Sequence, residues 1–339
     1  MPHNIAPVSV IIPAYNAAKS IERALKSVAE QTLPPAEIIV VDDGSNDDTV
    51  AVATAMQSLF LECQLIVISQ KNKGAGAARN CAIKAATEPY VAFLDADDEW
   101  LPNKLERSMG VLKSKNYTLV AHDYLDVTPN GEVHVSCARR FNEGPDPYVT
   151  LYLKGYIPSI SVVARRDIVV EAGGFDENLR NAQDFDLWLK ILAPPDTTFL
   201  VFEEPLARYY HTPGGIMSHT ERRIICCVQI AYRYLPALHA RHKSAIAILV
   251  QRLFNVYSEA FTVYVRSGKL IRAAMVPVRF AVAATKAAFN PDAASERKEF
   301  IAFWGFSIWV IAIFGLYISQ FQNLIGPVMS VLKRTVGIE

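Results

Sequence analysis

The chain has no excess of charge of either sign, because 34 Lys and Arg residues balance 34 Asp and Glu residues over 339 positions. Net charge therefore predicts neither a nucleic-acid partner nor a strongly acidic one. The charges are unevenly placed. Carboxylates cluster in about the first 210 residues, whereas the chain from about residue 220 onward is basic and apolar.

Cysteine is scarce, and its spacing matches neither a metal-ligand pattern nor a disulfide framework, which suits a reducing compartment. The five cysteines are Cys63, Cys81, Cys137, Cys226 and Cys227. Residues 1–20 also lack a basic region followed by an apolar stretch and a small-residue cleavage site. We therefore expect the N-terminal half in the cytoplasm.

Short apolar runs alternate with helical stretches four times in roughly the first 95 residues, which predicts right-handed βαβ units and a doubly wound α/β sheet. The predicted strands are 8–13, 38–41, 65–68 and 90–94, and the predicted helices are 18–30 and an Ala-rich helix through about 86. The pattern then loosens. Further strands are expected at 117–121, 132–135, 160–164 and 199–202, with a helix at 184–192. Mixed strands after a parallel core predict a substrate-binding subdomain within one globule.

The fourth apolar run, residues 90–94, leads directly into Asp95, Asp97 and Asp98. Three carboxylates this close repel one another unless a positive charge lies between them, and a hard divalent cation prefers oxygen ligands. Loops at the carboxyl ends of parallel strands are also where open α/β sheets bind ligands. The alternative is a solvated acidic turn whose Asp residues cap the next helix.

From about residue 220 the sequence reads as helical, with a hairpin of 242–265 and 269–288 across Ser267-Gly268. Residues 300–318 carry no charge, and nineteen helical residues span roughly 28 Å, close to a hydrocarbon core. Seven Lys or Arg residues between 266 and 298 precede this run, so a spanning helix would leave the N-terminal domain in the cytoplasm. The alternatives are a buried core helix and in-plane association of the basic helices with a membrane.

Four short elements occur in one order at suitable spacing. They are Pro13-Ala14-Tyr15-Asn16, Asp42-Asp43-Gly44-Ser45, Asn72-Lys73-Gly74 through Ala78-Arg79-Asn80, and Asp95-Ala96-Asp97-Asp98. As a set they closely resemble the family-2 glycosyltransferases, inverting enzymes with the nucleotide-sugar-binding GT-A fold, over about residues 8–212. The resemblance implies a GT-A domain over 1–215. The C-terminal third carries no family-defining motif, and its composition predicts a basic, amphipathic helical region over 216–299 and a transmembrane or membrane-associated helix with a short tail over 300–339.

The resemblance assigns a UDP-sugar site to these elements. Pro13, Tyr15 and Asn16 belong to the loop that lies against the uracil ring, where an aromatic face can stack on the base. Asp42 matches the carboxylate that accepts a hydrogen bond from the base, and Asp43 neighbours it; a turn-and-cap role is the alternative for both. Arg79 lies near the nucleotide and would answer the diphosphate charge, unless it is an ordinary helix-surface arginine.

The resemblance also implies a divalent cation, Mn²⁺ or Mg²⁺, that bridges the diphosphate oxygens. Asp97 is the expected direct ligand, and Asp95 is expected to reach the ribose or a metal-bound water. Asp98 is either a supporting group of this site or a helix cap.

An inverting transfer needs a carboxylate that takes the proton of the acceptor hydroxyl. In the family this is the Asp of a Glu-Asp pair at the start of a helix, and the matching residue is Asp184. Gln183 replaces the usual acid, which puts the tuning of the base in question. Asp186 is the reserve candidate, and an N-cap role is the alternative for Asp184.

Arg208 and His211 resemble the segment that closes over the donor diphosphate, and both are expected phosphate contacts. The Gln-x-x-Arg-Trp signature of processive synthases is absent. We therefore expect transfer of one sugar per encounter.

Together these features predict a membrane-associated inverting glycosyltransferase at the cytoplasmic face of the plasma membrane. It would move one sugar from a UDP-sugar to an acceptor hydroxyl, on a lipid-linked oligosaccharide of cell-surface polysaccharide synthesis. One alternative is a polyprenyl-phosphate sugar synthase, which needs no base. The others are a non-catalytic nucleotide-sugar-binding module and a soluble nucleotidyltransferase, although the last lacks a Gly-rich phosphate loop at the first strand.

Overall fold

The computed structural model describes residues 5–142, 144, 146–211 and 219–289. Its internal contacts divide the chain into two compact units, Met1–Ala237 and Leu238–Glu339. Helix α9 (Thr220–Arg233) therefore belongs to the first unit, although it follows the boundary expected at residue 215.

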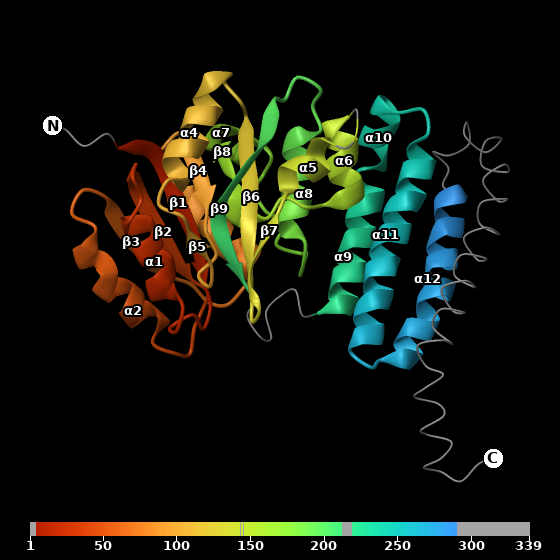
Figure 1. Ribbon diagram of the computed structural model, residues 1–339, viewed down its shortest axis with the longest axis horizontal. Coiled ribbons are helices and arrows are strands. Elements are labelled where there is room, and N and C mark those ends of the chain that lie inside the picture. The colour runs from red at the N-terminus through yellow and green to blue at the C-terminus, as the bar shows by residue number, and fades with distance from the viewer. Residues whose placement is uncertain (1–4, 143, 145, 212–218, 290–339) are drawn as a thin grey trace, which may run out of the picture. The chain divides into compact units, whose positions relative to one another are not determined.

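The first unit is built on one sheet whose parallel half comes from the N-terminal 95 residues (Figure 1). In spatial order its strands are β3 (Gln64–Ser69), β2 (Pro35–Asp42), β1 (Ala6–Ala14) and β4 (Tyr90–Phe93). All three pairings are parallel, so the carboxyl ends of these strands meet at one edge. The predicted βαβ core is confirmed.

The second half of the sheet is mixed, as expected from the loosened pattern. It continues with β8 (Val163–Arg165), β6 (Leu119–Thr128), β9 (Phe199–Tyr210) and β5 (Glu99–Trp100), and β7 (Gly131–Val135) pairs with β6. Strand β5 is only two residues long, but it pairs Glu99 with Arg208 and Trp100 with Ala207. This pairing brings the acidic loop 95–98 beside the end of β9.

Helices cover both faces of the sheet. The first face carries α1 (Ile21–Ala29), α2 (Thr49–Ala55) with the short helix η1 (Met56–Leu59), and α4 (Lys104–Ser114). Val10 and Ile12 of β1 bury against this face in one cluster with Leu25 and Leu105. The opposite face carries α3 (Ala75–Ala85) and α8 (Gln183–Leu192). There Trp188 of α8 packs its ring edge-on to Phe93 at 5.6 Å.

The remaining elements are short. They are α5 (Cys137–Asn142), α6 (Pro147–Lys154), η2 (Ser159–Ser161), α7 (Arg166–Glu171) and α10 (Leu235–Arg241). The strand expected at 160–164 is wrong in its first half, because η2 occupies it. Ser161 donates both its backbone N–H and its hydroxyl to the carbonyl of Pro158, and this closes a turn. Pairing begins only at Val163.

The second unit contains α11 (Ala245–Arg266) and α12 (Leu270–Ala288), which pack against each other as a hairpin. The predicted hairpin and its turn at Ser267-Gly268 are confirmed. No helix within the described ranges is long and apolar enough to cross a bilayer. The apolar run 300–318 lies outside the described residues.

Candidate active site

The predicted site residues come together at the carboxyl edge of the parallel strands. The loops after β1, β2 and β4 carry the Tyr15, Asp42 and Asp95 elements. The N-terminal end of α3 and the start of α8 approach the same edge, because Arg79 interacts with both Asp95 and Asp184. Two segments about a hundred residues apart therefore form one site.

The loop after β1 presents an aromatic ring on a fixed backbone. Tyr15 is 51% exposed, whereas Pro13 is half-buried. Asn16 adopts a left-handed backbone (φ 51°), its N–H donates to the Ser45 hydroxyl at 2.8 Å, and its side-chain oxygen accepts from Asn46 N–H at 2.9 Å. Asn16 thus holds two loops together, and Tyr15 is the residue with a face available for a base.

The two carboxylates after β2 are both buried but hold different partners. Asp42 accepts only from Ser45 N–H, at 3.3 Å to each oxygen, among the described residues. Asp43 accepts from Gln70 Nε2 (2.8 Å) and Lys73 N–H (2.9 Å) through Oδ1, and from Gly74 N–H (2.7 Å) through Oδ2. Asp43 therefore fixes the 70–74 loop that starts α3.

Arg79 is the positive centre of the site. Its side chain is 9% exposed, and its Nη2 donates to Asp95 Oδ1 at 2.5 Å. Burial acts to lower the pKa of the guanidinium, but Asp95, Asp184 and Asp97 outweigh it and raise that pKa. Arg79 is thus not a surface arginine. It interacts electrostatically with three of the predicted carboxylates, Asp95, Asp97 and Asp184.

Asp98 is the most deeply buried member of the acidic loop, at 1% exposed. Its Oδ1 accepts Tyr210 N–H at 2.8 Å, and its buried Oδ2 has no hydrogen-bond partner among the described residues. Burial and then the charges of Asp95 and Asp97 raise its pKa well above the usual range. The helix-cap alternative is wrong, because α4 starts at Lys104 with Asn103 in the cap position.

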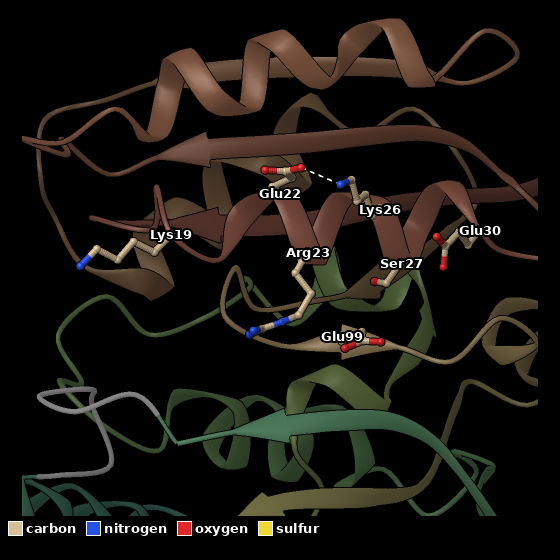
Figure 2. Close-up of a pocket in the computed structure, with 7 residues that line it drawn as sticks. All are labelled: Lys19, Glu22, Arg23, Lys26, Ser27, Glu30 and Glu99. Atoms are coloured by element: carbon tan, nitrogen blue, oxygen red, sulfur yellow. Dashed lines mark ion pairs between the residues drawn. The ribbon is translucent and has the colours of Figure 1, made fainter.

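Arg23 of α1 supports the acidic loop from the other side. Its Nη2 donates to the backbone carbonyl of Asp97, and its guanidinium lies 3.7 Å over the ring of Tyr210. Figure 2 shows Arg23 extending from α1 in a surface pocket lined mostly by charged residues, which come from α1, from the residues that flank it and from Glu99. Sequence reasoning missed Arg23, since on an amphipathic helix it looks like any exposed cation.

Asp184 lies at the start of α8 and is half-buried. Its Oδ1 accepts the N–H of Phe185 at 2.8 Å. Burial raises its pKa above the usual value, whereas the guanidinium of Arg79 lowers it and the charge of Asp95 raises it further. Arg223 also favours the ionised form. This carboxylate therefore lies close to the donor-side charges, as a base would have to.

Gln183 and Asp186, which lie beside Asp184 in the sequence, have different hydrogen-bond partners from it. Gln183 is buried, and its Nε2 donates to the backbone carbonyls of Leu179 (2.6 Å) and Asp176 (3.3 Å). Asp186 is also buried, and it accepts from Arg233 Nη1 of α9 at 2.7 Å. Both residues therefore hold the loop and helices in place, and Asp186 does not compete with Asp184 for the role of base.

Arg208 and His211 lie beyond the acidic loop and hold acidic partners of their own. Arg208 donates to Glu99 at 2.8 Å and to Glu132 at 2.7 Å. His211 Nε2 lies 2.7 Å from Asp126 Oδ1. Their predicted contact with phosphate stays a prediction.

The donor set fits a divalent cation that the substrate helps to hold. No cluster of three or more His, Cys, Asp or Glu residues that could hold a metal occurs among the described residues. Mg²⁺ and similar ions often take only one or two carboxylates and complete their coordination with phosphate oxygens and water. The buried Oδ2 of Asp98 has no hydrogen-bond partner among the described residues, and burial together with the charges of Asp95 and Asp97 raises the pKa of this carboxyl.

The loop that carries Phe175 is tied to α3 beside Arg79, and this contact was not anticipated. Asn80 exchanges hydrogen bonds with the backbone of Phe175 at 2.8 Å in each direction. Gly174 (φ 67°) leaves no room for a side chain, because a Cβ there would lie 2.4 Å from Asn80 Oδ1. The Gly173-Gly174 pair was the available sequence signal.

Comparison with known proteins agrees with this geometry. Residues 9–167 match the model of glycosyl transferase family 2. The UDP-Glc:alpha-D-GlcNAc-diphosphoundecaprenol beta-1,3-glucosyltransferase WfgD of Escherichia coli is 31% identical over 55% of this chain and 69% of its own length. The chain spans only 32–58% of the first three curated relatives that it matches.

Two solved structures share the fold. Staphylococcus aureus TarS in complex with UDP-GlcNAc aligns with a TM-score of 0.64 at 21% identity, over 82% of this chain and 81% of TarS. The mannosyltransferase PcManGT of Pyrobaculum calidifontis, in complex with GDP-Man and Mn²⁺, aligns with a TM-score of 0.53 at 20% identity, over 86% and 91%. Together with the match to WfgD, which exceeds two thirds of that relative, these findings show that the chain belongs to the family-2 glycosyltransferases.

Proposed function

We propose that this chain is an inverting glycosyltransferase that moves one sugar from a UDP-sugar to an acceptor hydroxyl. The observation that carries the proposal is the position of Arg79, whose guanidinium interacts with Asp95, Asp97 and Asp184 together. A donor-side acidic loop and an acceptor-side carboxylate thus meet around one buried cation.

Asp184 is the proposed base. Its carboxylate takes the proton of the acceptor hydroxyl as that oxygen forms a bond to the anomeric carbon, and the bond to the nucleoside diphosphate breaks on the opposite face. Burial raises the pKa of Asp184, and the guanidinium of Arg79 opposes this rise by favouring the ionised carboxylate. Because burial raises its pKa, transfer should decline as the pH falls through that pKa.

Asp97 and Asp95 would hold the divalent cation, Mn²⁺ or Mg²⁺, which when bound stabilises the charge that develops on the leaving diphosphate. The three carboxyl groups of the loop lie close enough that Asp95 and Asp97 raise the pKa of Asp98, and this proximity supports the assignment, as does the Mn²⁺ of PcManGT. Tyr15 would stack on the uracil, and Asp42 would accept a hydrogen bond from it. Arg208 and His211 would contact the diphosphate.

The substrates are proposed by analogy with the relatives. UDP is the nucleotide of both the WfgD donor and the TarS ligand. The WfgD acceptor is a sugar on diphosphoundecaprenol, which supports a lipid-linked acceptor in cell-surface polysaccharide synthesis and work at the cytoplasmic face of the membrane.

Titration calorimetry of UDP into the protein, with and without Mn²⁺, tests the donor site. We expect micromolar binding that requires the metal and is lost in Asp97→Ala. The matched control is Asp48→Ala, an exposed carboxylate beside the site. Binding that is indifferent to both metal and mutation would remove the metal assignment and favour a non-catalytic module.

A further inference from the structure

Helix α12 exposes a continuous apolar stripe along one side. The α12 stripe consists of Ile271 (84% exposed), Met275 (50%), Val278 (56%) and Val282 (66%), with Phe289 (68%) at the C-cap that directly follows the helix. Successive members are separated by four, three, four and seven residues, so they lie on one helical face. Isolated exposed apolar residues are ordinary, but an aligned row marks a contact surface.

The opposite side of α12 is already occupied. Val276, Phe280 and Ala287 are buried there, and the Phe280 ring packs edge-on against Phe254 (5.7 Å) and Tyr257 (6.1 Å) of α11. The α12 stripe is thus separate from the face that forms the hairpin.

A row of basic residues borders the stripe. Arg272 and Lys286 lie fourteen residues apart on one flank of the helix and are both exposed, whereas the half-buried Arg279 between them lies over the Tyr257 ring of α11 at 5.9 Å. The helix contains no Asp or Glu. An apolar face flanked by basic side chains is the pattern of a helix that lies in the plane of an anionic membrane surface.

The charge of the basic row argues against two other partners for the α12 stripe, a second copy of α12 and residues 300–318 of the same chain. A second copy of α12 packed antiparallel would bring the basic row against itself, and like charges at such a seam are destabilising. Residues 300–318 of the same chain carry no charge that could complement the row. Anionic phospholipid headgroups complement it directly.

We propose that the α12 stripe inserts into the interfacial layer of an anionic phospholipid membrane, while Arg272 and Lys286 contact the headgroup phosphates. The inference deepens the proposed function, because it rests on an acceptor that is held in a membrane. It commits to a helix lying in the surface and needs no spanning segment.

The test reads α12 directly in the full chain. A polarity-sensitive fluorescent amino acid is incorporated at position 282, or as a matched control at position 61, where Leu61 is 92% exposed in the first unit. The protein is titrated with vesicles of phosphatidylcholine alone or of equal parts phosphatidylcholine and phosphatidylglycerol. We expect a blue shift at position 282 only with the anionic vesicles, and none at position 61.

The basic row is tested with Arg272→Gln combined with Lys286→Gln, which should weaken binding to anionic vesicles at least tenfold. The same change of charge on α4, Lys113→Gln with Lys115→Gln, should have little effect. UDP binding without lipid should be unchanged in both variants, so a failure of membrane docking is distinguishable from a failure of the donor site.

Three results would overturn the proposal. One is an unchanged signal at position 282 in anionic vesicles. Another is a blue shift that follows protein concentration without lipid, which would indicate a second copy. The last is a label that is already in an apolar environment before lipid is added, which would indicate that another part of the chain covers the stripe.

Discussion

The ends of β2 and β4 both carry adjacent carboxylates, but the two sites have different chemistry. After β2, Asp43 uses both oxygens to accept three hydrogen bonds, so its charge is satisfied within the protein. After β4, one oxygen of Asp98 is buried without a partner among the described residues, and its pKa is raised. Asp43 therefore fixes a loop, whereas Asp98 keeps one oxygen without a hydrogen-bond partner among the described residues.

The same contrast recurs within the first turn of α8. Asp186 holds Arg233 of the following helix. Asp184, one half-turn earlier, faces the field of Arg79. Although only two positions apart, Asp186 therefore holds the structure together, whereas Asp184 is a candidate for the reaction.

The largest expected effect separates these two aspartates. Asp184→Asn should lower kcat by about 10²–10⁴-fold, because a general base contributes a factor of that size. Affinity for UDP should be unchanged. Steady-state transfer with a UDP-sugar panel, together with calorimetry of UDP, measures both.

Asp186→Asn is the matched control for that variant. It should lower the free energy of unfolding through loss of the Arg233 contact while the folded fraction retains its kcat. Full activity in Asp184→Asn would contradict the assigned base and favour a phosphate nucleophile, as in a polyprenyl-phosphate sugar synthase.

The next largest effect is expected for Asp43, whose carboxylate accepts three hydrogen bonds at the end of β2. Asp43→Ala leaves the N–H groups of Lys73 and Gly74 without their acceptor, which should cost about 2–4 kcal/mol of unfolding free energy. Urea denaturation measures it. Asp196→Ala, an exposed carboxylate in the turn before β9, should change stability by less than about 0.5 kcal/mol. An equal loss of unfolding free energy in the two variants would show that the hydrogen bonds of Asp43 do not stabilise the loop. The contrast drawn between the ends of β2 and β4 would then be wrong.

Gln183→Glu tests whether the family's usual acid is tolerated here. The new carboxylate would face the carbonyl oxygens of Leu179 and Asp176 in place of a donating amide, at a cost of about 1–3 kcal/mol near neutral pH. Protonation restores a donor, so the folded-state pKa of this Glu should be raised and the lost stability should return as the pH falls. Thermal unfolding of both proteins across acidic and neutral pH measures the difference. A constant difference would contradict the predicted hydrogen-bond reversal.

The smallest effect is expected for Lys104, which is a buried basic residue just as Asp98 is a buried acidic one. Its ammonium is fully buried over the Trp100 ring at 3.8 Å, and burial lowers its pKa well below the ordinary 10.5. Above the lowered folded-state pKa the unfolded chain binds more protons, so its contribution to stability rises with pH up to the ordinary pKa.

Lys104→Met should therefore be more stable at neutral pH by about 1–2 kcal/mol, and the difference from wild type should shrink as the pH approaches that value. Chemical denaturation along a pH series measures it. Lys113→Met, an exposed change on the same helix, should show no such convergence, and convergence in both variants would rule out burial as the cause.

Much of the fold was predictable because its parallel core repeats one pattern. The strand ends that carry Tyr15, Asp42 and Asp95 follow from short apolar runs and from the rule that parallel strands end at one edge. Helix α4 was missed because Lys104 and Ser108 lie on its buried face and interrupt the apolar spacing.

The sequence predicted which residues gather at the site, but not which of their carboxylates are hydrogen-bonded within the protein. Which carboxylates are satisfied depends on partners far away in sequence, such as Tyr210 for Asp98 and Arg233 for Asp186. Arg23 had no local signal, because its role appears only when β5 pairs with β9.

The pairing of β5 with β9 also sets an order of events during synthesis. The acidic loop emerges from the ribosome about 110 residues before its partner strand, which at 5–20 residues per second is a delay of roughly 5–20 s. Until then Asp98 lacks the N–H of Tyr210, and Arg23 lacks the ring over which it lies. A nascent chain therefore already carries its acidic residues but lacks the contacts that complete the proposed donor site, which form only near the end of the first unit.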